Sequence, residues 1–461
     1  MKKFINLLIV PLLLAGCSLD IPYDNQFSDP DAITTPVTGR ELLASAYSAL
    51  PNPGYDLALM TDDFVPTYWA SRNPSVANQY NWQPSALHDL AETLWPGYYS
   101  VIVTLNSLIE RLPEIAINTE ADRIAVNNLC AEAYTLKAYC YYQLLRLFAS
   151  DPTERPEADG IILKDKVIME TLPRSTVADC IAEIRRLLND ALQIGNSQAS
   201  ASWITEDATR LLLSEVELYA GNYKNAAEIA SALVDKRGYD CFAPSVYRTL
   251  WDGSSCEERI FMFDDPEKSQ SYYVGIVYDA VTGDYYSLDP SLASSFGEAD
   301  CRTEWTVVPF YSQSLGNQSF FGKYNLLRRE KRGITFINKM RLSHAVFVAA
   351  EAWCLDGNNQ SKAIEIINRF LLQRGASEID TDLTGDALLK EILVQKQKEF
   401  VGEGERYFDI KHYRRLLGAS IASRIPQADD YRWLWPLPKE EYLYNDQAEQ
   451  NPGWPKVTFN E

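Results

Sequence analysis

Apolar residues recur every three or four positions along most of this 461-residue chain, which is the period of an amphipathic helix. In the segment 38–50, for example, Leu42, Ala46 and Leu50 fall on one stripe. The same periodicity predicts helices over 38–50, 86–112, 120–148, 175–194, 205–219, 223–237, 340–355, 360–374, 386–401 and 407–417. Short strands are predicted at 259–263, 306–310 and 335–338. The fold class is therefore mainly α.

Two of the predicted helical pairs look like copies of one unit. Residues 211–222 and 349–358 are rich in small residues and end in Gly-Asn, and each is followed by a helix that opens on Ala. Small residues let two helices approach closely, and Gly supplies the left-handed turn between them. These pairs resemble tetratricopeptide hairpins, and helices 129–148 and 175–194 suggest another. Stacked pairs of this kind build scaffolds that usually serve binding.

Two stretches interrupt the helical pattern, at about 54–82 and 239–339. Both are crowded with Gly, Ser, Asp, Pro and aromatic residues, and the second contains the predicted strands. The chain is thus expected to be a helical scaffold that carries two loop-rich insertions. Binding residues concentrate on loops that a rigid scaffold holds in place.

The N-terminus has the pattern of a targeting segment. Lys2 and Lys3 precede an apolar run too short to span a bilayer, and the run ends in Leu14-Ala15-Gly16-Cys17. This ending resembles the bacterial lipobox, in which the cysteine is lipidated and becomes the new N-terminus. The alternative is an ordinary signal peptide with a chance cysteine. We expect a signal peptide at 1–16, a lipidated Cys17 (diacylglycerol and palmitate) with a flexible tether at 17–36, and one domain at 37–461.

The composition argues against several classes of partner and site. With 43 Lys and Arg against 63 Asp and Glu, the formal net charge of −20 argues against a nucleic-acid partner. Three scattered His make His-based catalysis or a His-rich zinc site unexpected. Seven Cys remain after Cys17, without CxxC or metal-ligand spacing, and a disulfide between Cys241 and Cys256 is one possibility, with Cys301 also in loop-like sequence. We expect no cofactor beyond the lipid on Cys17, and leave calcium open.

The order of motifs resembles the SusD/RagB family of outer-membrane nutrient-binding lipoproteins of Bacteroidetes. After the lipobox cysteine, the matching segments are Trp95-x-x-x-Tyr99-x-x-Ile102-x-x-x-Asn106, the aromatic helix 136–148, Pro173-Arg174-Ser175-Thr176-Val177, Lys398-Glu399-Phe400 with 403–411, Trp435-Pro436-Leu437-Pro438, and Gln450-Asn451-Pro452-Gly453-Trp454. Each motif alone is weak, but their shared order over the chain is specific. The resemblance implies a tetratricopeptide-like scaffold with loop-rich, small-β insertions.

The resemblance also implies a function. Such a lipoprotein lies on the cell surface at the outer membrane, held by its lipid alone. It binds oligosaccharides and delivers them to a TonB-dependent (SusC-like) transporter without breaking a bond. The alternatives are a peptide-capturing lipoprotein of the same fold, a surface glycosidase, and a helical scaffold for protein assembly. Glu403 and Glu405 could suggest the paired carboxylates of a glycosidase, but their place at a helix start favours a structural role.

In the family, ligand contacts come from two regions that correspond to the two insertions. Aromatic rings stack on sugar faces, and short polar groups bond the hydroxyls. We expect Trp82 and Trp305 to be exposed stacking platforms, with Asp63 and Arg72 as polar contacts. The further candidates, each of which could equally be ordinary packing, are Tyr68, Trp69, Asn81, Tyr285, Tyr286 and Tyr311.

Overall fold

The computed structural model of the protein describes residues 33–72, 74–263, 286–312, 316–324, 336–418 and 421–456. Two of the predicted residues, Cys17 and Tyr285, lie outside these ranges. The backbone of Trp69 lies inside them, but its side chain is not among the described ones. The fold has begun by Ile33, whose side chain is buried three residues before the predicted end of the tether.

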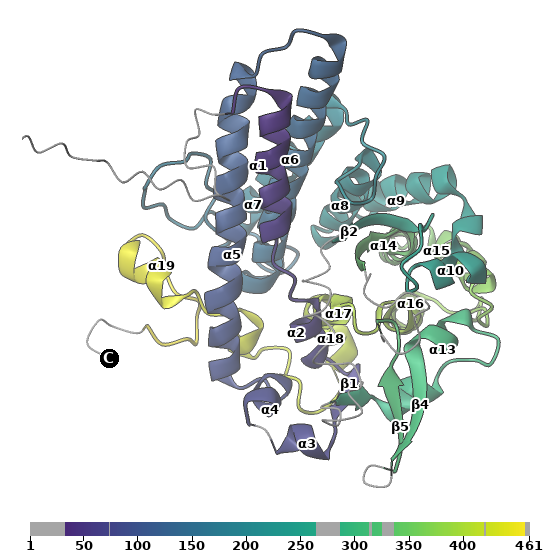
Figure 1. Cartoon of the computed structure of the whole chain (residues 1–461). Helices are drawn as coiled ribbons and strands as arrows, with labels where there is room; N and C mark the ends of the chain where they lie inside the picture. Colours follow the sequence, from purple (N-terminus) through teal and green to yellow (C-terminus); the bar gives the residue numbers. More distant parts are fainter. Residues whose placement is uncertain are drawn as a thin grey trace, which may run out of the picture.

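Four long helices form one side of the molecule and stand side by side (Figure 1). They are α1 (Pro36–Ala49), α5 (Pro84–Arg111), α6 (Glu120–Phe148) and α7 (Val177–Ile194). Each starts within two residues of its predicted position, because threonine caps precede α1, α6 and α7 and a proline opens α5. The Thr119 hydroxyl, for example, accepts from the backbone N–H of Asp122, and Thr176 does the same for Asp179. Pro96 lies inside α5 without ending it.

The predicted repeat is confirmed by two helical hairpins. They consist of α8 (Glu206–Tyr219) with α9 (Tyr223–Arg237), and of α14 (Leu342–Leu355) with α15 (Gln360–Gln373). Gly221 and Gly357 turn the chain at positive φ, +80° and +74°. Helices α9 and α14 pack closely against each other because alanines fill their contact faces. The mainly α, tetratricopeptide-like scaffold is therefore present as predicted.

The later helices complete this scaffold. They are α16 (Gly385–Phe400), α17 (Glu405–His412), α18 (Arg414–Leu417) and α19 (Lys439–Tyr444). The sequence predicted α17 and α18 as one helix over 407–417, but the chain breaks at Tyr413. Short 3-10 turns follow α5 and α9 and precede the C-terminal segment, at η2 (Leu112–Glu114), η3 (Tyr239–Phe242) and η6 (Tyr431–Trp433).

In the residues that the structure describes, the two insertions contain short helices and three small antiparallel sheets. The helices are α2 (Gly54–Leu59), α3 (Tyr68–Ser71), α4 (Pro74–Tyr80), α10 (Pro244–Thr249), α12 (Pro290–Ser294) and α13 (Cys301–Thr306). The strand pairs are β1 (Phe64–Pro66) with β3 (Tyr286–Leu288), β2 (Arg259–Phe263) with β6 (Ile337–Arg341), and β4 (Val307–Ser312) with β5 (Gly316–Phe321). The predicted strands correspond to β2, β4 and β6.

A buried ionic network joins the second insertion to the scaffold. At its centre, Glu399 of α16 accepts from Arg341 at 2.7 Å and from Arg374 at 2.8 Å, and lies 3.7 Å from Arg302. Glu258 bridges Arg341 and Arg374 from the other side, at 2.9 and 2.7 Å. Burial alone would raise the pKa of Glu399, but Arg374, Arg341 and Arg302 lower it well below its usual range.

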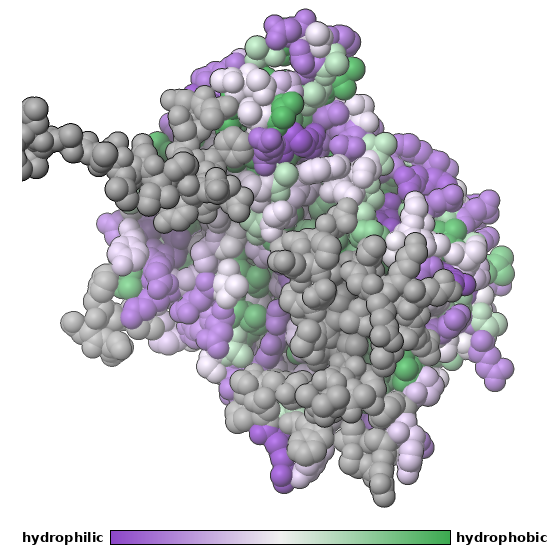
Figure 2. Space-filling view, viewed as in Figure 1, coloured by the Kyte–Doolittle hydropathy of each residue, from purple (hydrophilic) through white to green (hydrophobic). Residues whose placement is uncertain are grey.

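Other whole-chain features bear on the sequence expectations. All seven described cysteines, Cys241, Cys256 and Cys301 among them, carry free thiols, so the possible disulfide is absent. In the described ranges, no helix combines the length and apolar character needed to cross a membrane. Hydrophilic residues predominate on the face in Figure 2 wherever it is coloured, and hydrophobic residues form only small separate areas there.

Candidate functional site

The structure brings the two insertions together at one end of the molecule. Strand β1 of the first pairs with β3 of the second, with Phe64 opposite Leu288 and Pro66 opposite Tyr286. Strand β3 in turn lies close to β5, which pairs with β4 in a separate two-stranded sheet. Helices α3 and α4 and the β4–β5 hairpin lie at the same end of the molecule (Figure 1). The two predicted ligand regions thus meet at one end of the molecule, and the outer surface of α3, α4 and the β4–β5 hairpin there is called the composite face below.

Four of the predicted residues are accessible on this face. Tyr68 is 52% exposed, and the guanidinium of Arg72 lies 4.5 Å from the centre of its ring, one turn along α3. Tyr311 is 71% exposed near the tip of the β4–β5 hairpin. Asn81 is exposed just after α4. These residues retain the aromatic and polar character that a sugar site requires.

Trp82 is not an exposed platform, which corrects the prediction. Its ring is 1% exposed, stacks on Tyr407 at 5.6 Å and meets Trp433 edge-on at 4.7 Å. Its Nε1 donates to the Met60 carbonyl at 2.8 Å. The backbone of Trp82 has a φ of +54°. Within the described ranges, no other non-glycine residue has a positive φ. The Trp82 side chain packs between the first insertion and α17, so it holds the insertion in position.

Trp305, Tyr286 and Asp63 are also buried, contrary to expectation. Trp305 packs into the core from α13, and Tyr286 lies inside the β1–β3 pair against Tyr80. Asp63 accepts from the backbone N–H of Gly402 at 3.1 Å and from Gln397 at 3.0 Å. The alternation of aromatic and polar residues does not reveal which side of a short strand faces the core, so the sequence could not separate these residues from Tyr311.

Arginines distant in sequence hold the first insertion, and sequence reasoning missed them. Arg406 of α17 binds Asp62 through two hydrogen bonds of 2.8 Å. Arg424 lies 3.5 Å from the ring centre of Tyr80 and donates to its carbonyl at 2.7 Å. Arg424 also donates to the carbonyl of Thr61. More than 300 residues separate these partners, and no local pattern indicates the pairing.

Glu403 and Glu405 serve structure, as the sequence indicated, and not as a facing acid pair. The buried Glu403 carboxylate accepts from Lys323 at 2.7 Å and from Arg341 at 2.9 Å. Glu405 lies in the first turn of α17, 4.0 Å from Arg146. The neighbouring Arg406 pairs with Asp62 and with neither glutamate.

We expect Asp63 to make stability pH-dependent. Burial, followed by the charge of Asp62, raises the pKa of Asp63 from 3.8 to about 7. The folded protein therefore holds this proton over a range where the unfolded chain has lost it, and the ionised carboxylate destabilises the fold as pH rises from about 4 to about 7. Asp63→Asn should gain unfolding free energy relative to wild type between pH 5 and pH 8.

Urea unfolding at each pH measures this difference. Asp429→Asn is the matched control, because the Asp429 side chain is mostly exposed and pairs with Arg415 at the surface. Parallel profiles for Asp63→Asn and wild type would contradict the assignment.

Comparison with known proteins agrees with the fold. A SusD-like family model, described as "Starch-binding associating with outer membrane", matches residues 40–210. SusD-like protein P2 of Formosa agariphila is 24% identical in an alignment of 425 positions, which covers 79% of this chain and 81% of that protein.

Solved structures share the whole architecture. A SusD superfamily protein from Bacteroides vulgatus has a TM-score of 0.77 at 20% identity, over 92% of this chain and all of that one. A "Laminarin binding SusD-like protein" has a TM-score of 0.71 at 17% identity, over 91% of this chain and all of its own. At these identities the likeness concerns the fold. The family model over residues 40–210, the relative and the shared architecture agree, and the chain is similar to SusD-like proteins in sequence and in fold.

Proposed function

We propose that this protein captures oligosaccharides on the composite face and does not cleave them. The observation that carries the proposal is the joining of the two insertions, which places Tyr68 with Arg72 on α3 and Tyr311 on the β4–β5 hairpin at one end of the molecule. Exposed rings held on a rigid scaffold suit the C–H faces of sugars, and Arg72 and Asn81 offer hydrogen bonds to hydroxyls.

The comparisons support a carbohydrate ligand. The matched family model is described as starch-binding, and one protein of the same fold is described as laminarin-binding. Starch and laminarin are both glucose polymers, so malto-oligosaccharides and laminari-oligosaccharides are the first probes.

Tyr311→Ala and Tyr68→Ala should each weaken oligosaccharide binding by about tenfold, because one aromatic contact in a sugar site contributes roughly 1–1.5 kcal/mol. Isothermal titration calorimetry of residues 18–461 with the two oligosaccharide series measures the change. Tyr444→Ala is the control, since Tyr444 is 72% exposed but lies on α19, which borders neither insertion. Full affinity in both test variants would remove this face from consideration. Binding of short peptides in place of sugars would favour the peptide-capturing alternative.

We further propose that Cys17 carries the lipid, that residues 37–461 form one domain facing the cell exterior, and that a TonB-dependent transporter receives the oligosaccharide. The family model's description, which includes association with the outer membrane, supports this location. Cys17→Ala should release the protein from the outer-membrane fraction. Affinity purification of the lipidated protein from its own cells should recover a TonB-dependent barrel. Retention of Cys17→Ala in the membrane would contradict the anchor.

A further inference from the structure

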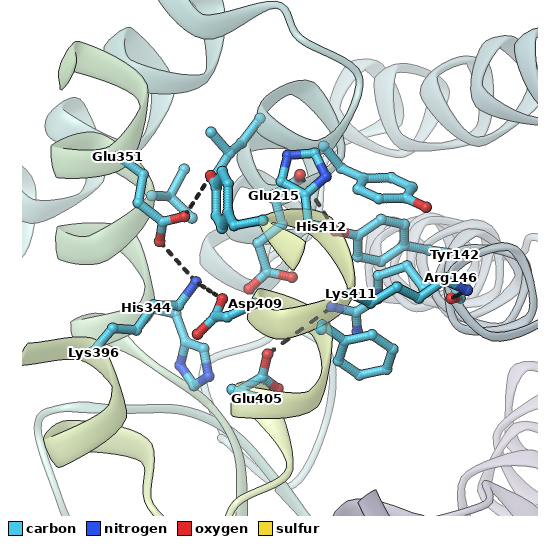
Figure 3. A pocket seen from close by; sticks show the side chains of 15 residues that line it. Tyr142, Arg146, Glu215, His344, Glu351, Lys396, Glu405, Asp409, Lys411 and His412 are labelled. Atoms are coloured by element: carbon cyan, nitrogen blue, oxygen red, sulfur yellow. Dashed lines mark hydrogen bonds and ion pairs between the residues drawn. The ribbon is translucent and has the colours of Figure 1, made fainter. Parts of the chain in front are cut away.

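A second site, lined by charged and polar side chains, lies in the helical scaffold, apart from the composite face. It is a cavity of about 70 Å³ between α6, α8, α14, α16 and α17, with acidic side chains from α8, α14 and α17 on its walls (Figure 3). A water molecule needs roughly 10–15 Å³ of such space, so the cavity could hold a molecule of about four or five non-hydrogen atoms.

The cations around the cavity are already engaged. Lys396 donates to Glu351 and to Asp409 at 2.7 Å each (Figure 3). Lys411 donates to the backbone carbonyls that end α6, among them that of Leu147 at 3.2 Å. Arg146 bonds Gln143 at 2.9 Å and lies against the rings of Tyr142 and Phe408.

Two of the acidic side chains on the walls, in contrast, have open acceptor oxygens. Asp409 is 5% exposed, and its Oδ2 has no hydrogen-bond partner although its Oδ1 binds Lys396. The half-buried carboxylate of Glu215 receives no hydrogen bond or ion pair from the described residues. Burial, helped by the charge of Glu405, raises the pKa of Glu215 to about 7. The Nε of Arg146 is also buried without a hydrogen-bond partner among the described residues.

These open groups define what would fit. A primary ammonium supplies three N–H donors and a positive charge to the free oxygens of Asp409 and Glu215. A hydroxyl at the other end of such a molecule would accept from Nε of Arg146. A coordinated metal ion fits less well, because no three His, Cys, Asp or Glu side chains within the described ranges are arranged to hold one. The Glu405 side chain is 22% exposed, which leaves one wall of the cavity open to solvent.

We propose that this cavity binds a small primary ammonium compound, with Asp409 and Glu215 as acceptors of its N–H groups. The site is independent of the proposed sugar face, since it uses none of the same residues.

Ethanolamine is the test probe, because a molecule of about four non-hydrogen atoms matches the volume of the cavity. It also carries both an ammonium and a hydroxyl. Saturation-transfer NMR and calorimetry on residues 18–461 should show one bound ethanolamine per chain. The neutral isostere 1-propanol, which lacks the charge, and tetramethylammonium, which lacks N–H donors, should not bind. Equal binding of either one would overturn the proposal.

Glu215→Gln is the decisive variant and should weaken ethanolamine by about tenfold or more, because a charge-assisted hydrogen bond becomes a neutral one. The fold should tolerate it, since no side chain depends on the Glu215 carboxylate. Glu228→Gln, on the exposed side of α9 near Lys224, is the matched control and should bind as wild type does. Unchanged affinity in Glu215→Gln would overturn the assignment. A crystal of wild type soaked in ethanolamine provides a test without any variant, and only water in the cavity would refute the proposal.

Discussion

Glu399→Gln should lower the free energy of unfolding by about 3–5 kcal/mol, the cost of breaking a buried ion pair by removing one partner. The substitution keeps the shape of the side chain but removes the negative charge between Arg341, Arg374 and Arg302, all of which are inaccessible to solvent. The three guanidinium groups would then share the charge of Glu258 and their outer partners. The second insertion should loosen first, because β6 and α13 are tied to α16 through this network.

Guanidinium unfolding followed by circular dichroism measures the loss, and Glu365→Gln is the matched control. Glu365 pairs with Arg369 on the exposed side of α15 at 4.0 Å, an interaction worth roughly 0–1 kcal/mol. The folded pKa of Glu399 lies below its ordinary value of 4.5, so its stabilisation is present above that pH and is lost as pH falls below it. The difference between wild type and Glu399→Gln should therefore stay constant from neutral pH down to about pH 5 and narrow below about 4.5. Equal midpoints for the two proteins at pH 7 would contradict the network.

Trp82→Ala should cost about 3–5 kcal/mol of unfolding free energy, as expected for removing a large aromatic side chain from a core. The change deletes the stack on Tyr407, the edge contact with Trp433 and the hydrogen bond to Met60. It also leaves a cavity between the first insertion and α17. Trp82→Phe should cost less, because it keeps part of the ring contact and loses the indole N–H.

The same unfolding measurement distinguishes a buried Trp82 side chain from an exposed one. Tyr444→Ala, at an exposed position, should change stability by less than about 0.5 kcal/mol. A wild-type midpoint for Trp82→Ala would mean that the ring is not packed as described. A large stability loss in Trp82→Ala would also explain any loss of sugar binding in that variant, which is why Tyr68 and Tyr311 are the better tests of the ligand face.

Much of the scaffold could be predicted because its signals are local. A 3.6-residue hydrophobic period, a Thr cap such as Thr119 and a Gly turn such as Gly221 all act within one or two helical turns, so they are legible without knowing the fold. The ends of α6 and α9 match the predicted residues. The paired hairpins could be predicted for the same reason, since each repeats a short pattern of small residues followed by a glycine.

The candidate site was predicted only in its outline. The sequence located the two aromatic insertions, and Tyr68, Arg72, Asn81 and Tyr311 are exposed there. Trp82 and Trp305 were wrong as exposed platforms, because a tryptophan in a loop-like sequence can turn either way. Its direction depends on what packs beneath it, and for Trp82 that partner is Tyr407, more than 300 residues later in the chain.

The sequence by itself therefore determined the long helices, the repeated hairpins, the likeness to SusD-type proteins and the positions of the two aromatic, loop-rich insertions. Only the tertiary structure decided which side chains in those regions face solvent, which arginine neutralises which carboxylate, and that a polar cavity opens between α6, α8, α14, α16 and α17. The physical reason is the range of each interaction. Helix formation depends on neighbours along the chain, whereas burial and charge pairing depend on neighbours in space.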